Sequence, residues 1–262
     1  MTSDEFRHAL LTHFNEFART LATAAGDWVV KGFIDIYQNI YTISVDTKVI
    51  SKIIELMLFP VIARFAVEHG YRMVLSEYQN RYPDVSFIAP DETKIALDLK
   101  STYRISDELV NGFTLGAFTG YFRQRQSAKN ITFPYEQYAA HFVLGAIYSR
   151  SDEGVDERHV YTLDDLQSIV SVVKDFRFLL QEKWRIASDR PGSGNTKNIG
   201  SARDIQALVE GNGSFAVHGQ EVFDDYWMNY LTDDMARAID STIPYHNLET
   251  YWQWRNRATR RR

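Results

Sequence analysis

Residues 83–102 have the sequence PDVSFIAPDETKIALDLKST, and their pattern predicts a β-hairpin. Val85–Ile88 is a short apolar run, which is typical of a buried strand. Along 94–102 an apolar side chain occupies every second position from 95 to 99, which is the period of a strand. Pro90 and Asp91 are turn formers and lie between the two runs. Such a hairpin supplies two neighbouring strands of a larger sheet.

The rest of the chain alternates between helical and extended patterns. Apolar residues at spacings of three and four predict one N-terminal helix, which starts with a Thr2–Glu5 capping box and ends near Gly26. A second helix should begin at Thr47 and kink at Pro60. Extended structure is expected at 28–43, 71–75, 141–148 and 176–186, a loop at 189–201, and helices near 202–209, 221–231 and 248–262. This mixture predicts an α/β fold with a central mixed β-sheet flanked by helices.

The composition is that of a folded globular protein. The chain has 262 residues, of which 45% are hydrophobic, 24% charged and 14% aromatic. It contains no cysteine, which excludes disulfides, thiolate zinc sites and a cysteine nucleophile. No run approaches the roughly 20 apolar residues that span a membrane, and the N-terminus does not resemble a signal peptide. We therefore expect a cytoplasmic protein without a membrane partner.

Charge is distributed unevenly along the chain. The net charge of −5 argues weakly against a nucleic-acid partner. The last twelve residues, 251–262, nevertheless hold five arginines and no acid, so a local basic surface could bind phosphate. A solvated basic tail is an equally good interpretation of this segment. The seven histidines include no His-Glu-x-x-His pattern, and His141 lies in an apolar run typical of a core residue.

Three polar residues of the hairpin could carry chemistry. Asp98 and Lys100 are two apart on a strand, so their side chains point to one face, about 7 Å apart. Asp84 opens the adjacent strand and could join them. Two close carboxylates repel each other, and a Mg²⁺ ion would relieve the repulsion and favour phosphodiester hydrolysis. An ordinary surface hairpin is the alternative, because Asp-x-Lys is a common pattern.

Longer stretches carry a resemblance that is far more specific. In chain order they read DTKVISKIIEL, EHGY, QNRYPD, KIALDLKSTY, FTLGAFTGYFR, KNITFPYEQY, SGNTKNIGS and DYWMNY. With these motifs the chain resembles the EcoRV-like type II restriction endonucleases over nearly its whole length after about the first 25 residues. The resemblance implies a restriction-endonuclease-like fold and a single endonuclease domain over 1–262. Residues 1–46 and the C-terminal helices would then belong to the dimer interface or the DNA cleft.

The resemblance also implies roles for the polar residues. Asp84, Asp98 and Lys100 match the catalytic centre, in which the two aspartates hold Mg²⁺. Glu55 matches an accessory catalytic carboxylate near the metal, although an acid in an apolar helix is otherwise most often on its exposed face. The implied activity is Mg²⁺-dependent cleavage of duplex DNA by a homodimer in a bacterial cytoplasm. The site implied is the palindrome GATATC, cut bluntly at its centre to leave 5′-phosphates.

Two loops and two single residues match DNA-contacting positions of the family. A Gly-rich loop would enter the major groove, a second loop would face the minor groove, and the two residues would touch backbone phosphate. In that order these are Gly192, Ser193, Gly194, Asn195, Thr196 and Asn198; Gln79 and Asn80; and Thr47 and Lys129. Asparagine can pair with an adenine edge, and glycine lets the backbone approach the bases.

Some alternatives stay open. The Gly-rich loop could be a plain flexible turn, and it lacks the Gly-Lys-Ser/Thr ending of a nucleotide-binding loop, so no nucleotide cofactor is expected. Lys197 departs from the family pattern, which has a threonine there, and could shift the sequence preference. A DNA-binding protein without cleavage activity is the alternative function.

Overall fold

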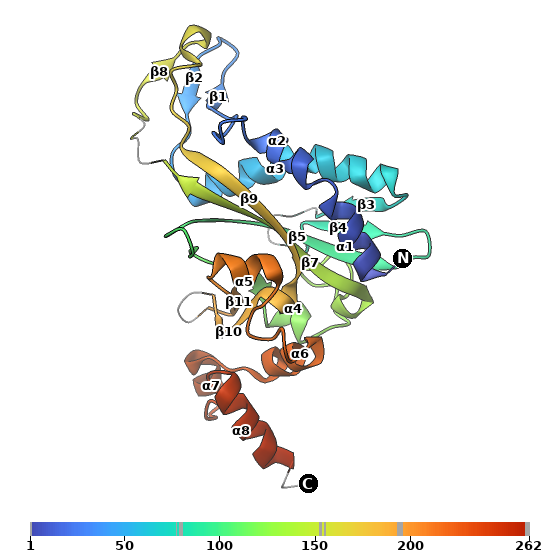
Figure 1. The fold of residues 1–262 in the computed structure, drawn as a ribbon. Coiled ribbons are helices and arrows are strands. Elements are labelled where there is room, and N and C mark those ends of the chain that lie inside the picture. The colour runs from blue at the N-terminus through green and yellow to red at the C-terminus, as the bar shows by residue number, and fades with distance from the viewer. Residues whose placement is uncertain are drawn as a thin grey trace.

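A five-stranded mixed sheet forms the centre of the computed structural model, which describes residues 2–76, 78, 81–151, 154, 156–192 and 196–259 (Figure 1). Its strand order is β3-β4-β5-β7-β9. The strands are β3 Arg72–Leu75, β4 Val85–Ile88, β5 Lys94–Tyr103, β7 Tyr138–Arg150 and β9 Val173–Glu182. The pairing of β5 with β7 is parallel, whereas the other three pairings are antiparallel. The predicted α/β class with a mixed sheet and its central hairpin are confirmed.

Three N-terminal helices cover one face of this sheet. They are α1 Ser3–Leu11, α2 Phe14–Leu21 and α3 Thr47–Glu68. Their apolar sides bury Phe6, Phe17 and Phe65 against sheet residues such as Phe87 and Phe142. Burial of apolar surface of this size is the main term that stabilises such a layer.

The structure corrects the prediction of one N-terminal helix. The capping box of Thr2 and Glu5 is present, but the helix breaks after Leu11 and resumes at Phe14. The Thr12 hydroxyl donates to the carbonyl of Ala9 at 2.7 Å, a local bond that competes with the regular helix ladder. Helix α2 ends at Leu21, so the predicted end of the N-terminal helix near Gly26 was wrong.

Helix α3 is continuous and capped at its start. The Asp46 carboxylate accepts hydrogen bonds from the backbone N–H groups of Lys48 and Val49. Pro60 lies inside the helix, which continues through it to Glu68 because its apolar residues pack along the sheet. Gly70 follows in the left-handed conformation that favours glycine.

The second face of the sheet carries a smaller sheet, short helices and an aromatic core. The smaller sheet has the order β10-β11-β6, with β10 Ala187–Pro191, β11 Asn198–Ser201 and β6 Thr114–Ala117. The helices are α4 Lys183–Ile186, α5 Ile205–Glu210, α6 Gln220–Asn229, α7 Asp233–Ala238 and α8 Leu248–Thr259, and the 3₁₀ turns are η1 Gly120–Phe122 and η2 Tyr135–Gln137. The strand expected at 176–186 therefore ends at Glu182. The segment 189–201, expected to be a loop, is occupied at its two ends by β10 and β11.

A third, small sheet stands away from the central one (Figure 1). It consists of β1 Gly32–Ile34, β2 Ile40–Thr42 and β8 Val160–Tyr161, which is followed by the 3₁₀ turn η3 Leu163–Asp165. Within the described part of the chain, every helix is too short or too polar to cross a bilayer.

Candidate active site

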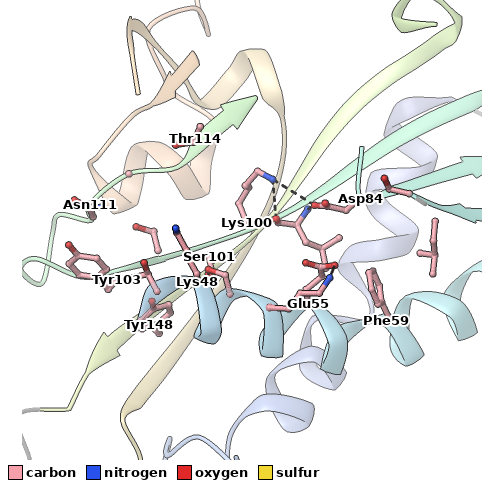
Figure 2. A pocket seen from close by; sticks show the side chains of 18 of the residues that line it. Lys48, Glu55, Phe59, Asp84, Lys100, Ser101, Tyr103, Asn111, Thr114 and Tyr148 are labelled. Carbon is pink, nitrogen blue, oxygen red and sulfur yellow. Dashed lines mark hydrogen bonds and ion pairs between the residues drawn. The ribbon is translucent and has the colours of Figure 1, made fainter. Parts of the chain in front are cut away.

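The candidate site lies where β5 runs past the end of β4. Pairing with β4 covers only 94–97 of β5, whereas pairing with β7 continues to Tyr103. Beyond Leu97, the β4 side of β5 has no paired strand among the described residues. This free strand edge forms part of the wall of a cleft of about 900 Å³ (Figure 2).

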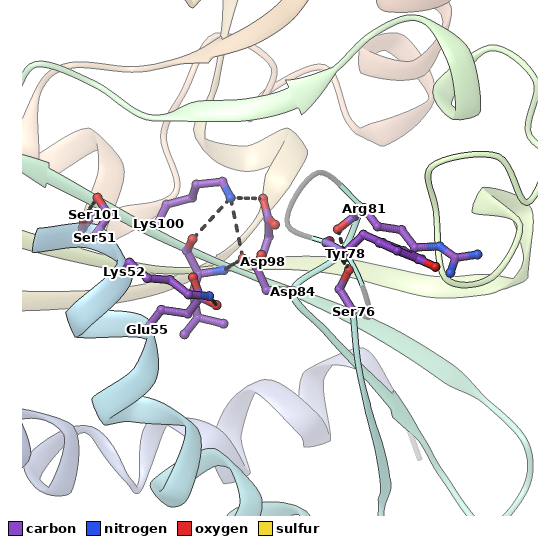
Figure 3. A network of polar contacts seen from close by, with 11 residues as sticks. Ser51, Lys52, Glu55, Ser76, Tyr78, Arg81, Asp84, Asp98, Lys100 and Ser101 are labelled. Carbon is purple, nitrogen blue, oxygen red and sulfur yellow. Dashed lines mark hydrogen bonds and ion pairs between the residues drawn. The ribbon is translucent and has the colours of Figure 1, made fainter. Parts of the chain in front are cut away.

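Asp84, Asp98 and Lys100 meet at the start of this free edge (Figure 3). Asp84 directly precedes β4, and the antiparallel register of β4 and β5 brings it beside Asp98. Lys100 Nζ lies 2.8 Å from Asp98 Oδ2 and 3.7 Å from Asp84 Oδ2. The backbone N–H of Leu99 donates to Asp84 Oδ2 at 2.7 Å and holds that carboxylate against the strand. The hairpin thus brings together the three residues that the spacing singled out.

The charges in this group affect one another strongly. Burial, followed by the nearby Asp98 carboxylate, raises the pKa of Asp84 to about 7. Burial opposes the charged form of Lys100, but the Asp98 and Asp84 carboxylates outweigh it and raise the pKa of Lys100 above its usual range. Lys100 is therefore a cation at neutral pH, and one ammonium stands between two acids.

These residues fit a divalent cation. Asp98 is only 3% exposed, and its Oδ2, although ion-paired with Lys100, accepts no hydrogen bond from any described residue. A bound cation would offset the burial and the repulsion by Asp98 that together raise the pKa of Asp84. Carboxylate oxygens without a histidine are hard donors, which suit Mg²⁺ better than Zn²⁺. Asp84 and Asp98 are the residues that would hold such an ion.

Helix α3 forms the opposite wall of the cleft. Its lining residues include Thr47, Lys48, Ser51, Lys52 and Glu55. The hydroxyls of Ser51 and Ser101 share a hydrogen bond of 2.7 Å, which ties α3 to β5. Sequence reasoning missed Lys48 and Lys52. Polar residues recur at helical spacing along this otherwise apolar helix, and that pattern could have revealed them.

Glu55 lines the cleft but stands apart from the two aspartates. Its Oε1 accepts a hydrogen bond of 2.6 Å from Lys52 Nζ. The carboxylates of Glu55, Asp84 and Asp98 do not all lie within 4.8 Å of one another. Burial lowers the pKa of Lys100, and the Glu55 charge adds to the larger effects of Asp98 and Asp84 that raise it. The structure therefore places Glu55 at the margin of the group.

The β10–β11 hairpin carries the two ends of the Gly-rich loop. The Gly192 N–H donates to the Asn198 carbonyl at 2.9 Å and closes the hairpin. Asn198 pairs with Ala117 of β6, and Thr114 at the other end of β6 lines the cleft. Through β6, the described ends of the loop are thus fastened to the cleft wall.

The other candidate DNA-contacting residues are placed in different ways. The Thr196 hydroxyl is buried and has no hydrogen-bond partner among the described residues. Lys129 is exposed on a turn between η1 and η2, outside the set that lines the cleft. Five candidates lie outside the described residues: Gln79, Asn80, Ser193, Gly194 and Asn195.

A buried cation behind the cleft, Lys183, was also missed. It is 1% exposed, and its Nζ has no hydrogen-bond partner in the described chain. That nitrogen lies 4.4 Å from the centre of the Tyr82 ring and 5.7 Å from that of Tyr135. His141, correctly expected in the core, pairs with the Tyr82 hydroxyl at 3.0 Å. Burial lowers the pKa of Lys183 to about 8, although the Asp98 charge opposes this. Nothing in the local sequence signals this burial.

Lys183→Met should stabilise the fold at neutral pH. The folded chain releases the Lys183 proton near pH 8, whereas the unfolded chain holds it to about 10.5. Below pH 8 the buried charge therefore lowers stability, and the loss fades as the pH rises toward 10.5. We expect the variant to gain on the order of 1–3 kcal/mol at pH 7 and much less at pH 10. Urea unfolding at both values measures this, and an equal gain at both would contradict it.

The chain is similar in sequence to known restriction endonucleases. The profile of the family described as "Restriction endonuclease EcoRV" matches residues 24–256. The chain is 38% identical over 228 residues to the "Type II restriction enzyme EcoRV" of Escherichia coli, covering 86% of this chain and 90% of that protein. Among solved structures, the "NlaIV restriction endonuclease" aligns over 97% of this chain and 96% of its own, with 12% identity and a TM-score of 0.40. The chain therefore belongs to the EcoRV family and is a type II restriction endonuclease.

Proposed function

We propose that this endonuclease hydrolyses duplex DNA at a palindromic six-base site in a Mg²⁺-dependent reaction. The observation that carries the proposal is the meeting of Asp84, Asp98 and Lys100 at a free strand edge. Asp84 and Lys100 line a large cleft, and Asp98 is buried directly beside them. The resemblance makes GATATC, cut bluntly at its centre to leave 5′-phosphates, the best candidate site. A single endonuclease domain over 1–262, in a bacterial cytoplasm, belongs to the same proposal.

Each residue of the group has a distinct task in this proposal. Asp84 and Asp98 hold the cation, which when bound makes water more acidic and withdraws charge from the phosphate. Lys100, kept protonated by its two acidic neighbours, donates to the phosphate oxygens and stabilises the charge that develops there. Glu55 is the accessory carboxylate at the margin. Its partner Lys52 lines the same cleft and would contact a DNA phosphate.

We assign DNA recognition to two loops and to polar residues of the cleft wall. Thr47, Lys48 and Lys52 line the wall where backbone phosphates would lie. The loop that includes Gly192, Ser193, Gly194, Asn195, Thr196 and Asn198 would read the major groove, and Gln79 and Asn80 would face the minor groove. Lys129 is exposed on a turn and is proposed as a more distant phosphate contact. Lys197 would add a charge beside the bases.

The proposed active unit is a homodimer. One active centre cuts one strand, so cutting both strands of a palindrome requires two chains related by a two-fold axis. The β1–β2 hairpin exposes five large hydrophobic side chains, those of Phe33, Ile34, Ile36, Tyr37 and Tyr41. The Asp35 carboxylate accepts hydrogen bonds from the backbone N–H groups of Tyr37 and Asn39 and holds this turn in shape. An ordered, exposed apolar surface of this kind suits a second copy of the chain.

Ile36→Asp is expected to weaken this dimer. Ile36 is 88% exposed, so the substitution should spare the fold of the single chain while it places a charge in the interface. Analytical ultracentrifugation should show a shift toward monomer, and double-strand cleavage should fall at least about tenfold at low protein concentration. Val217→Asp, at a residue also 88% exposed but on another surface, is the matched control. A dimer that survives Ile36→Asp unchanged would exclude this hairpin from the interface.

Digestion of a fully sequenced plasmid, followed by sequencing of the ends, tests the whole proposal. With Mg²⁺ we expect discrete blunt fragments with 5′-phosphates, cut at the centre of GATATC, and with a chelator no cleavage. Discrete fragments from another palindrome would retain the activity and correct the recognition site. A gel shift without nicking under any divalent cation would instead favour a DNA-binding protein without cleavage activity.

A further inference from the structure

A second cluster of metal-ligating side chains lies at the far end of α3. His13 stands at the start of α2, and Glu68 and His69 stand at the end of α3. One potential ligand atom from each of these residues lies within 4.8 Å of the other two. Glu55 and Glu68 are 13 positions apart on one helix, which separates the cluster from Glu55 by about 20 Å along the helix axis. It is therefore independent of Asp84 and Asp98.

The two imidazoles are held in place by a shared aromatic neighbour. The fully buried Phe65 ring contacts His13 edge-on, with ring centres 5.5 Å apart. The same ring lies 4.8 Å from the His69 ring. Packing of this kind restricts side-chain rotation, so less entropy is lost when the rings bind a ligand.

His13 also has the supporting contact that is common among metal-binding histidines. Its Nδ1 lies 3.3 Å from Glu16 Oε2, and its Nε2 faces Glu68 Oε2 at 3.5 Å. A carboxylate on one ring nitrogen fixes the tautomer and directs the other nitrogen toward a metal. The Arg64 guanidinium donates to Glu16 Oε1, so Glu16 is held between Arg64 and His13. Glu16 is thus a supporting residue, and Glu68 is left to act as a ligand.

We propose that His13, Glu68 and His69 bind a Zn²⁺-type divalent cation that joins α2 to the end of α3. Two imidazole nitrogens and one carboxylate form a borderline donor set, which selects Zn²⁺ over Mg²⁺. The ligand atoms of tetrahedral zinc lie about 3.3 Å apart. The three potential ligand atoms here lie within 4.8 Å of one another, so small side-chain movements would bring them to that distance. The Glu68 side chain is 55% exposed, which leaves a fourth position open to water. The ion stabilises the helical layer that supports the cleft.

Zinc titration of the full-length, chelator-treated Asp98→Ala protein by calorimetry tests this site, because that variant weakens the cation centre of the cleft. We expect the protein to bind one zinc ion per chain. The Glu68→Gln and His69→Gln substitutions should each lower the zinc affinity at least about tenfold. Glu16→Gln, which removes only the support of His13, should lower zinc affinity by about 10- to 100-fold. Zinc should also raise the melting temperature of the parent protein but not that of Glu68→Gln. The Glu68 side chain is exposed, so its substitution should not disturb the fold, and the lost response would reflect lost zinc binding.

His8→Ala is the matched control for a surface histidine outside the cluster. His8 is bonded to the Asp4 carbonyl on α1, and its loss should leave zinc affinity unchanged. Absence of zinc binding overturns the proposal. So does zinc binding that is the same in the Glu68→Gln and His69→Gln variants as in the parent protein.

Discussion

Asp98→Ala is expected to lower the rate of DNA cleavage by at least about 10³-fold while DNA binding persists. Asp98 is buried, and its Oδ2 lies 2.8 Å from Lys100 Nζ. Its loss removes a ligand of the proposed metal and the partner that orients Lys100, both of which act on the reacting phosphate. Linearisation of a supercoiled plasmid measures the rate, and a gel shift measures binding.

Glu92→Ala is the matched control for this variant. Glu92 lies in the turn of the same hairpin, its side chain is 74% exposed, and it is at the opposite end from the cleft. The control should cut at the normal rate. If Asp98→Ala also cuts at the normal rate, the cleavage centre lies elsewhere.

Asp84→Asn should abolish most cleavage and yet stabilise the metal-free protein. The folded chain holds the Asp84 proton up to about pH 7, whereas the unfolded chain releases it near pH 4. Between these values the folded state binds more protons, so the stability of the native chain falls as the pH rises. Above pH 7 asparagine removes a carboxylate that is buried and repelled by Asp98, which costs on the order of 1–3 kcal/mol.

Urea unfolding in a chelator at pH 4.5 and pH 8 measures this effect. The gain in the free energy of unfolding should be small at the lower pH and largest at the higher one. Added Mg²⁺ should stabilise the wild-type chain and leave Asp84→Asn nearly unchanged, because the variant lacks one metal ligand. If Asp84→Asn is no more stable than the wild type at pH 8, the ionised Asp84 carboxylate does not destabilise the fold and this prediction is wrong.

Asp84 and Lys183 each lower the stability of the folded, metal-free chain. Two acids are crowded on one side of the sheet edge, and a lysine without a hydrogen-bond partner among the described residues is buried behind them. Each arrangement is unfavourable by itself in the metal-free chain. Strain of this kind is common where a fold holds charges ready for a substrate and a cation.

Local sequence patterns determined the hairpin and its polar group. A two-residue period fixes which side chains share a strand face, so Asp98 and Lys100 had to point the same way. The capping box at Thr2 and the N-terminal start of α3 were also readable, since both depend on residues within one helical turn. The family resemblance then supplied roles that spacing alone left open, including that of Glu55.

Only the tertiary structure decided features that depend on residues far apart in the chain. The free edge of β5 exists because β4 starts only at Val85, opposite Leu97. Lys183 is buried because rings from distant segments close over it. His13 meets Glu68 and His69 only when α2 packs against α3. Periodicity reports a residue's neighbours within one element, whereas burial and pKa depend on what other elements bring alongside it.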